Sequence, residues 1–140
     1  VMTPARQTAI GIALALAILA AWASVHAYAL FFYEIGGSSL LLAPLLLATA
    51  CWLNVGLFIV AHDAMHGSLA PGRPAVNRLF GRIALALYAG FWFDALRKSH
   101  FEHHRAPGTA DDPDFGATPR LIPWYAGFLR RYFGLAQFLA

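Results

Sequence analysis

The chain opens with a long apolar stretch that carries no formal charge. From Gln7 to Tyr33 there is no Asp, Glu, Lys or Arg. At 1.5 Å per residue, a helix of this length measures about 40 Å, enough to cross a hydrocarbon core of about 30 Å with some tilt. A secretory signal peptide is the competing interpretation, because Ala21-Trp22-Ala23 has the form of a cleavage site. The apolar character continues well past that site, so the pattern predicts a transmembrane helix over about residues 8–33.

A second apolar stretch follows after a short turn. The segment Glu34-Ile35-Gly36-Gly37-Ser38-Ser39 contains two adjacent glycines, which interrupt a helix. The run from Leu40 to Ala61 then predicts a second transmembrane helix over about residues 39–62, with Pro44 in its first turn, where a missing N–H is tolerated. Asn54 is the one strongly polar residue at depth in this run. It either faces the same interior as His62 or forms an interhelical hydrogen bond.

The rest of the chain has shorter apolar segments. Between Arg82 and Asp94 the apolar run would form a helix of only about 16 Å, too short to cross a bilayer. We therefore predict an interfacial helix over about residues 82–96 and a second short helix over about 97–106. Aromatic and basic residues predict a further interfacial segment over 121–140.

Composition and charge agree with a membrane protein. Of all residues, 59% are hydrophobic and 12% are charged, against about 25% charged in a soluble domain. Arg6 precedes the first apolar run, the other nine Lys and Arg residues follow Pro71, and the turn between the two runs has none. The positive-inside rule then places both ends of the hairpin in the cytoplasm. This uneven distribution does not favour a nucleic-acid binder. We predict an all-α integral membrane fold in a single domain, with a transmembrane helical hairpin followed by interfacial helices.

Histidines are concentrated in two short windows. Five of the six histidines lie there: His62 and His66 in the first window, and His100, His103 and His104 in the second. Spacings of three and four residues place side chains on one face of a helix. Imidazole is a common ligand of zinc, copper, iron and nickel, so the pattern predicts a metal site. A set of ordinary interface histidines is the alternative for either window alone.

Two other interpretations of the polar motifs are weaker. A zinc protease needs H-E-x-x-H, with Glu as its general base, but here the shorter Asp63 follows His62. The acidic turn Asp111-Asp112-Pro113-Asp114 resembles part of a calcium loop, yet it contains proline and lacks the later Glu that such a loop requires.

The two windows resemble the first two histidine boxes of the membrane fatty-acid desaturase and hydroxylase superfamily. The pattern H-x-x-x-H ends a predicted transmembrane hairpin, and H-x-x-H-H follows a predicted interfacial helix. Within that superfamily, the segments Phe58–Pro74, Leu87–Phe91 and Ala106–Phe115 are similar to bacterial β-carotene ketolases. The resemblance runs from about Thr3 to Ala140.

This resemblance implies a di-iron oxygenase in the bacterial inner membrane, with the histidine boxes on the cytoplasmic side. It would use dioxygen and electrons from a ferredoxin-like donor to introduce a keto group at C4 of a β-ionone ring, taking its carotenoid substrate from the bilayer. The implied ligands of the two iron ions include His62, His66, His100, His103 and His104. Asp63, Asp94 and Glu102 are possible acceptors for imidazole N–H groups.

The chain departs from the family pattern in one respect. The family has a third, downstream box, H-H-x-x-H-H, and no such run occurs here. Five imidazoles are too few for two irons, so we expect an incomplete N-terminal portion, inactive alone and weak in iron binding. A carotenoid or fatty-acyl hydroxylase or desaturase on the same scaffold is one alternative. A non-catalytic metal-binding membrane subunit is another.

Overall fold

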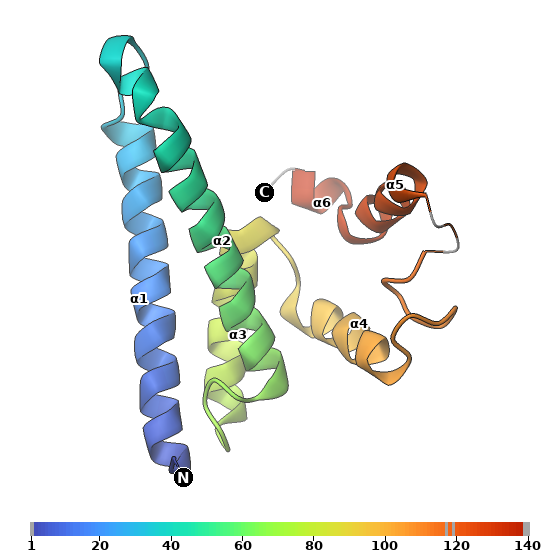
Figure 1. The fold of residues 1–140 in the computed structure, drawn as a ribbon. Helices are drawn as coiled ribbons and strands as arrows, with labels where there is room; N and C mark the ends of the chain where they lie inside the picture. Colours follow the sequence, from blue (N-terminus) through green and yellow to red (C-terminus); the bar gives the residue numbers. More distant parts are fainter. Residues whose placement is uncertain (1, 117, 119, 139–140) are drawn as a thin grey trace. The chain divides into compact units, whose positions relative to one another are not determined.

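A computed structural model describes residues 2–116, 118 and 120–138, and these residues form helices and connecting loops without a β-strand. The predicted all-α class is confirmed. In chain order (Figure 1) the elements are α1 (Pro4–Phe31), the 3₁₀ helix η1 (Gly37–Leu41), α2 (Ala43–His66), α3 (Pro74–Ala89), α4 (Phe93–Arg105), α5 (Leu121–Tyr132) and α6 (Leu135–Phe138). The chain divides into two compact units, residues 1–88 and 89–140, which are described separately below.

Helix α1 begins earlier than the apolar pattern alone predicts. Thr3 is its N-cap, and its side-chain oxygen accepts a hydrogen bond from the Arg6 N–H at 3.3 Å. Pro4 occupies the first helical position, where the absent N–H has no partner to lose. The helix therefore gains a polar first turn before the uncharged stretch begins.

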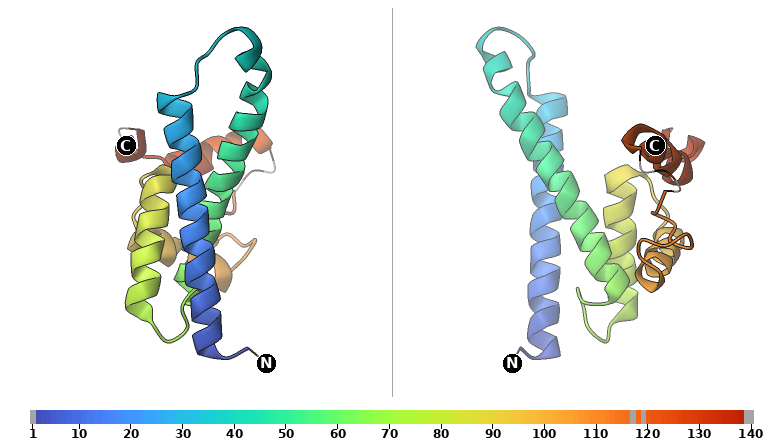
Figure 2. Two further views of the ribbon diagram at one scale, coloured as in Figure 1. Left: turned by 90° about the vertical axis from the view of Figure 1, so that its left-hand side faces the viewer. Right: turned by 45° about the vertical axis from the view of Figure 1, so that its right-hand side comes forward.

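Helices α1 and α2 pack along one another as a hairpin, which can be followed in both views of Figure 2. The Trp22 indole N–H donates to the Asn54 side-chain oxygen at 2.8 Å. Asn54 thus forms the interhelical hydrogen bond that was one of its two possible roles. His26 stacks on Trp22 with 4.0 Å between ring centroids, and its Nδ1 lies 2.8 Å from the Trp22 carbonyl oxygen. Polar groups inside the hairpin are in this way paired with each other.

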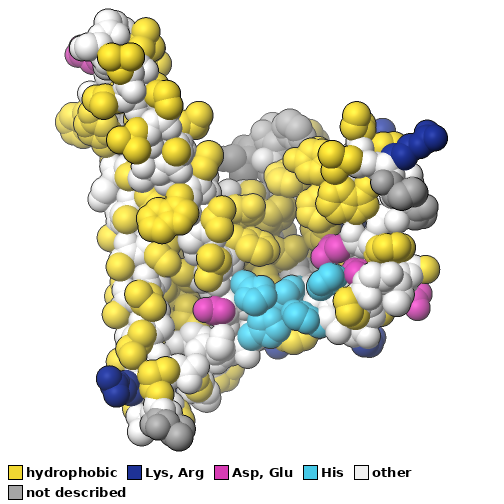
Figure 3. Space-filling model, viewed as in Figure 1, with side chains coloured by type: hydrophobic (Ala, Val, Ile, Leu, Met, Phe, Trp, Pro, Cys, Tyr) yellow, Lys and Arg dark blue, Asp and Glu magenta, His cyan; other side chains and the backbone are white. Residues whose placement is uncertain are grey.

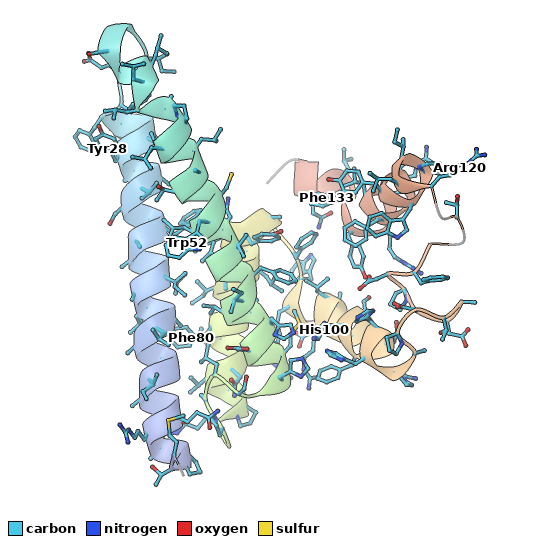
Figure 4. The ribbon with its side chains drawn as sticks, in the orientation of Figure 1. Tyr28, Trp52, Phe80, His100, Arg120 and Phe133 are labelled. Atoms are coloured by element: carbon cyan, nitrogen blue, oxygen red, sulfur yellow. The ribbon has the colours of Figure 1, made fainter. Side chains whose placement is uncertain are left out.

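The outer surface of this hairpin suits a bilayer. Among the described residues, α1 and α2 are the helices that are long and apolar enough to cross a membrane singly. Taken as one broken span, α3 and α4 would pass the same test. Figure 3 shows hydrophobic side chains over most of the visible face of α1 and α2. Tyr28 and Trp52, labelled in Figure 4, are both exposed, and the exposed fraction of Trp52 is 73%. The protein is accordingly a membrane protein.

Helix α3 differs from the interfacial helix predicted over 82–96. It begins at Pro74, earlier than the predicted start, and it ends at Ala89. Proline is favourable in the first helical turn, and Gly90, with φ of +67°, adopts the left-handed conformation that terminates helices. The predicted continuous helix is therefore divided at residues 90–92, and α4 starts at Phe93 instead of about residue 97.

A buried amide attaches the loop after α2 to α3. Asn77 is only 5% exposed. Its side-chain oxygen accepts from the Ala70 N–H at 3.0 Å, and its amide nitrogen donates to the carbonyls of Ala70 at 2.7 Å and Arg73 at 3.1 Å. This loop is thereby held in one conformation directly after the first histidine window.

In the second unit, helix α5 holds the acidic loop that follows α4. The Trp124 indole N–H donates to the Asp114 carbonyl at 3.1 Å, and the Tyr132 hydroxyl donates to the Asp114 carboxylate. Arg131 donates to the Pro113 carbonyl. An edge-on contact between Phe91 and Phe133, with centroids 5.3 Å apart, adds an apolar attachment.

Candidate metal centre

The first histidine pair lies at the carboxyl end of α2. His66 is the last residue of this helix, and His62 precedes it by one turn. Their ring centroids are 4.7 Å apart. The helix stops here because Gly67 adopts the left-handed conformation with φ of +74° and donates its N–H back to Ala64 and Asp63 carbonyls. The shared helical face predicted from the spacing of this pair is present in the structure.

Asp63 lies beside His62, at the end of the same helix. The His62 Nδ1 and Asp63 Oδ1 atoms are 3.6 Å apart, which is an ion-pair distance longer than a hydrogen bond. The Asp63 backbone carbonyl accepts from the N–H and the hydroxyl of Ser68, at 3.0 and 3.1 Å. Asp63 therefore contributes to the turn that follows His66 through its main chain.

The second window lies on α4, where His100, labelled in Figure 4, is paired with His104. Their Nε2 atoms are 3.1 Å apart. Two nitrogens bound to one metal at about 2.1 Å each, at angles of 90–109°, would be about 3.0–3.4 Å apart. The observed separation fits either a hydrogen bond between the two imidazoles or joint coordination of one ion. These two residues thus present a donor pair that a transition metal can use without rearrangement.

His103, from the same window, lies against a buried carboxylate. Its Nδ1 is 2.9 Å from Asp112 Oδ1 and 3.0 Å from Asp112 Oδ2. Asp114 Oδ2 is further from the same nitrogen, at 3.7 Å. One ligand atom from each of these three residues lies within 4.8 Å of the others. The pairing leaves the Nε2 atom of His103 available for a different partner.

Hydrogen bonding sets the protonation of both groups. Burial by itself would raise the pKa of the Asp112 carboxyl, but hydrogen bonds from the Gly108 N–H, the Asp114 N–H and His103 lower its pKa to about 2. The hydrogen bond to Asp112 raises the pKa of His103 above its usual value, against an opposing effect of burial. Asp112 is consequently a carboxylate at neutral pH.

Asp112 is a residue that reasoning from sequence missed. The acids selected as imidazole partners were neighbours of histidines in sequence or lay on the same helix. Glu102 is 3.9 Å from Lys98, and Asp94 is in the first turn of α4. Their role as imidazole acceptors stays a prediction. The available signal for Asp112 was its position in an acidic turn shortly after Pro107-Gly108, which brings the chain back towards the end of α4.

Comparison with known proteins agrees with this geometry. Residues 37–140 match the sequence profile of the family described as fatty acid desaturase. The chain belongs to the fatty acid desaturase family. It is 48% identical over 128 residues to the β-carotene ketolase of Paracoccus sp. (strain PC1), covering 91% of this chain and 52% of that protein. This confirms the predicted resemblance to the ketolases.

More distant relatives in the family carry similar names. The chain is 35% identical over 158 residues to the β-carotene ketolase of Haematococcus lacustris, covering 96% of this chain and 49% of that protein. It is 36% identical over 146 residues to the zeaxanthin 4-ketolase of Chlamydomonas reinhardtii, covering 97% and 33%. The chain thus spans about half the length, or less, of these curated relatives. No solved structure gives a significant match.

Proposed function

We propose that this chain carries part of the catalytic machinery of a carotenoid ketolase, which introduces a keto group at C4 of the β-ionone ring of β-carotene or a related carotenoid. The observation that carries the proposal is the 48% identity to the Paracoccus β-carotene ketolase across 91% of the chain. The donor set supports it, because the two histidine windows supply imidazoles at helix ends. The apolar surface of the hairpin supports it too, since a carotenoid is dissolved in the bilayer.

The cofactor in this proposal is a pair of iron ions. His62 and His66 would hold metal from α2, and His100, His103 and His104 from α4. Imidazole nitrogen suits iron, although it also suits zinc and copper, so the choice of iron comes from the family resemblance. When bound, the iron would activate dioxygen and so supply the oxidising power needed to oxidise an allylic C–H bond of the ring. Five imidazoles are a partial ligand set for two ions.

The overall reaction determines which partners are needed. Each oxygenation of the ring CH₂ consumes one dioxygen and two electrons, takes up two protons, inserts one oxygen atom and releases one water. A second round at the same carbon gives a geminal diol, which loses water to form the ketone. We propose a ferredoxin-like protein as the electron donor and a site on the cytoplasmic side of a bacterial inner membrane. The position of nine basic residues after Pro71 supports that orientation.

The test is product analysis with a chimera. Residues 1–140 are fused in register to the remaining part of the Paracoccus sp. (strain PC1) relative and expressed in a bacterial host that makes β-carotene. The expected product is a C4 ketone, identified by chromatography, absorption and mass. The intact relative is the positive control, and the chimera with His104→Ala is the negative control, with its membrane level checked by immunoblot.

Other products would overturn the proposal in different ways. A chimera that accumulates in the membrane and makes an alcohol or a new double bond identifies a hydroxylase or desaturase. A chimera that accumulates, retains metal and leaves β-carotene unchanged, while the intact relative makes ketone, argues for a non-catalytic metal-binding role.

A further inference from the structure

The His103–Asp112 contact is more specific than a surface ion pair. Both carboxylate oxygens lie within 3.0 Å of the same ring nitrogen, Nδ1. The Asp112 side chain is 3% exposed, whereas that of His103 is 37% exposed. An ionised carboxylate can only accept hydrogen bonds, so Nδ1 must carry the proton. In a neutral imidazole, the other nitrogen then has a free lone pair.

The carboxylate is itself held in place by the loop. The Gly108 N–H donates to Asp112 Oδ2 at 2.7 Å, and the Asp114 N–H donates to Oδ1 at 2.8 Å. Gly108 has φ of +71°, a conformation that favours glycine and directs this N–H to the carboxylate. Each oxygen therefore has a fixed main-chain donor in addition to His103, and the carboxylate cannot rotate without losing both.

The same donors argue against a metal ion between these residues. The group His103, Asp112 and Asp114 is compact enough to bind a cation. A cation there would replace the proton on Nδ1 and compete with two main-chain N–H groups for the same carboxylate oxygens. Asp114 is also engaged, because its carboxylate accepts from the Tyr132 hydroxyl. The contacts fit an orienting network better than a coordination site.

We propose that Asp112 is a positioning residue that fixes His103 in the Nδ1–H tautomer and thereby makes Nε2 its metal-binding nitrogen. The second half of this statement rests on the proposed function, in which His103 is an iron ligand. The first half concerns the metal-free chain alone. Partners of this type that orient a metal-binding imidazole typically change metal affinity about 10–100-fold when they are mutated.

The decisive measurement is ¹⁵N NMR of histidine-labelled, metal-free chain in detergent micelles, at a pH above the raised pKa of His103, where its imidazole is neutral. The His103 signals are assigned by their loss in His103→Gln. We expect Nδ1 to be protonated and Nε2 unprotonated in the unmodified chain. Asp112→Ala and the near-isosteric Asp112→Asn should each shift the tautomer ratio about tenfold or more towards Nε2–H. The matched control is Asp111→Ala, at an exposed acid next in sequence, which should leave the ratio unchanged.

Folding is monitored by circular dichroism, and Asp112→Asn keeps the test valid if Asp112→Ala loses helix. A protonated Nε2 in the unmodified chain, or an unchanged ratio in folded Asp112→Asn, overturns the proposal. A second readout is the metal content of the chimera, which should fall about tenfold or more at limiting iron in Asp112→Asn and not in Asp111→Ala. If the tautomer is as expected and the chimera makes no ketone, the proposed function fails while the role of Asp112 in setting the tautomer stands.

Discussion

At the scale of single residues, Asn77 has a structural role next to the first histidine pair. Its buried amide satisfies the main-chain N–H and C=O of Ala70 and one carbonyl of the turn. Leaving buried main-chain groups unpaired costs about 1–3 kcal/mol. The Asn77 side chain therefore stabilises the conformation of the loop after His66.

Replacing Asn77 with Leu, whose side chain is also branched at Cγ but has no hydrogen-bonding atoms, should lower the free energy of unfolding by about 2–3 kcal/mol, because the main-chain groups of Ala70 stay buried. The matched control is Gln7→Leu, which removes a single exposed hydrogen bond from Gln7 to the Ser68 carbonyl and should cost less than about 1 kcal/mol. Both are measured by denaturant titration in detergent. Equal losses for the two variants would contradict the role given to Asn77.

The acidic loop of the second unit should show a dependence on pH. The pKa of Asp112 is lowered to about 2 in the folded chain, against 3.8 in the unfolded chain. The ionised carboxylate therefore stabilises the fold at pH values above about 4, and this contribution is lost as the pH falls from about 4 to about 2. The pKa of His103 is raised in the folded chain, so protonated His103 contributes fully to stability below pH 6.5. This contribution is lost as the pH rises through the pKa of His103 in the folded chain. The Trp124 indole is hydrogen-bonded to this loop, so its fluorescence should report the change of the loop at acid pH when the other tryptophans are replaced by Phe. Asp112→Asn should remove that change.

Sequence reasoning succeeded and failed at this scale for a physical reason. His62 with His66, and His100 with His104, follow from helical periodicity, which is local. The partner of His103 does not, because Asp112 reaches it only through a reversal of the chain at Gly108. Such a return depends on main-chain hydrogen bonds that a residue pattern does not reveal. The assignment of all five histidines as metal ligands remains a prediction.

At the scale of elements, a close approach of backbone to backbone joins α1 to the loop after α2. A Cβ atom added at Gly11 would lie 2.2 Å from the Leu69 carbonyl oxygen, a rigid main-chain atom. Leu69 is buried, and Gln7, one turn earlier on α1, bonds to the neighbouring Ser68. The first helix thus supports the loop that follows the first histidine pair.

Gly11→Ala should therefore destabilise the hairpin by about 1–3 kcal/mol, as overpacking typically does, despite the better helix propensity of alanine. Gly127→Ala on α5 is the control, since no neighbouring atom lies within 4 Å of the added Cβ. That change should be neutral or stabilising by up to about 1 kcal/mol. Thermal unfolding of the two variants in the same detergent compares them. A stable Gly11→Ala would show that α1 and the loop separate readily.

The helices themselves were predictable where composition is extreme. Two uncharged apolar stretches are sufficient to locate α1 and α2. Their first turns depend on capping by Thr3 and on the 3₁₀ helix η1, so the predicted ends differ by a few residues. The break at Gly90 was missed because a short apolar run does not show where a helix stops.

At the scale of the whole molecule, the proposed iron centre takes its ligands from both compact units of the chain. The histidines on α2 belong to residues 1–88 and those on α4 to residues 89–140. If both sets hold the same metal ions, metal should couple the two units. Nothing in the sequence pattern specifies this coupling, because periodicity acts only within one helix.

Spin labels can test the coupling in the chimera. Cys51, the single cysteine of this chain, is exposed on α2, and Arg120→Cys adds a second site in the other unit, with any cysteine of the fused part removed. Adding diamagnetic Zn²⁺ to metal-free protein should narrow the distribution of distances between the labels, and a chelator should broaden it again. His66→Ala combined with His104→Ala should abolish the response. An identical distribution with and without metal would contradict a shared centre.

The location of each histidine pair at a helix end has an electrostatic consequence. His66 is the last residue of α2, and His103 and His104 lie in the last turn of α4. The carboxyl end of a helix carries a partial negative charge of about half an electron. Neutral imidazoles bring no charge of their own, so each helix end would offset part of the charge of a cation that its own histidines bind. Such a site favours cations over anions and stabilises the more highly charged state of a redox-active metal.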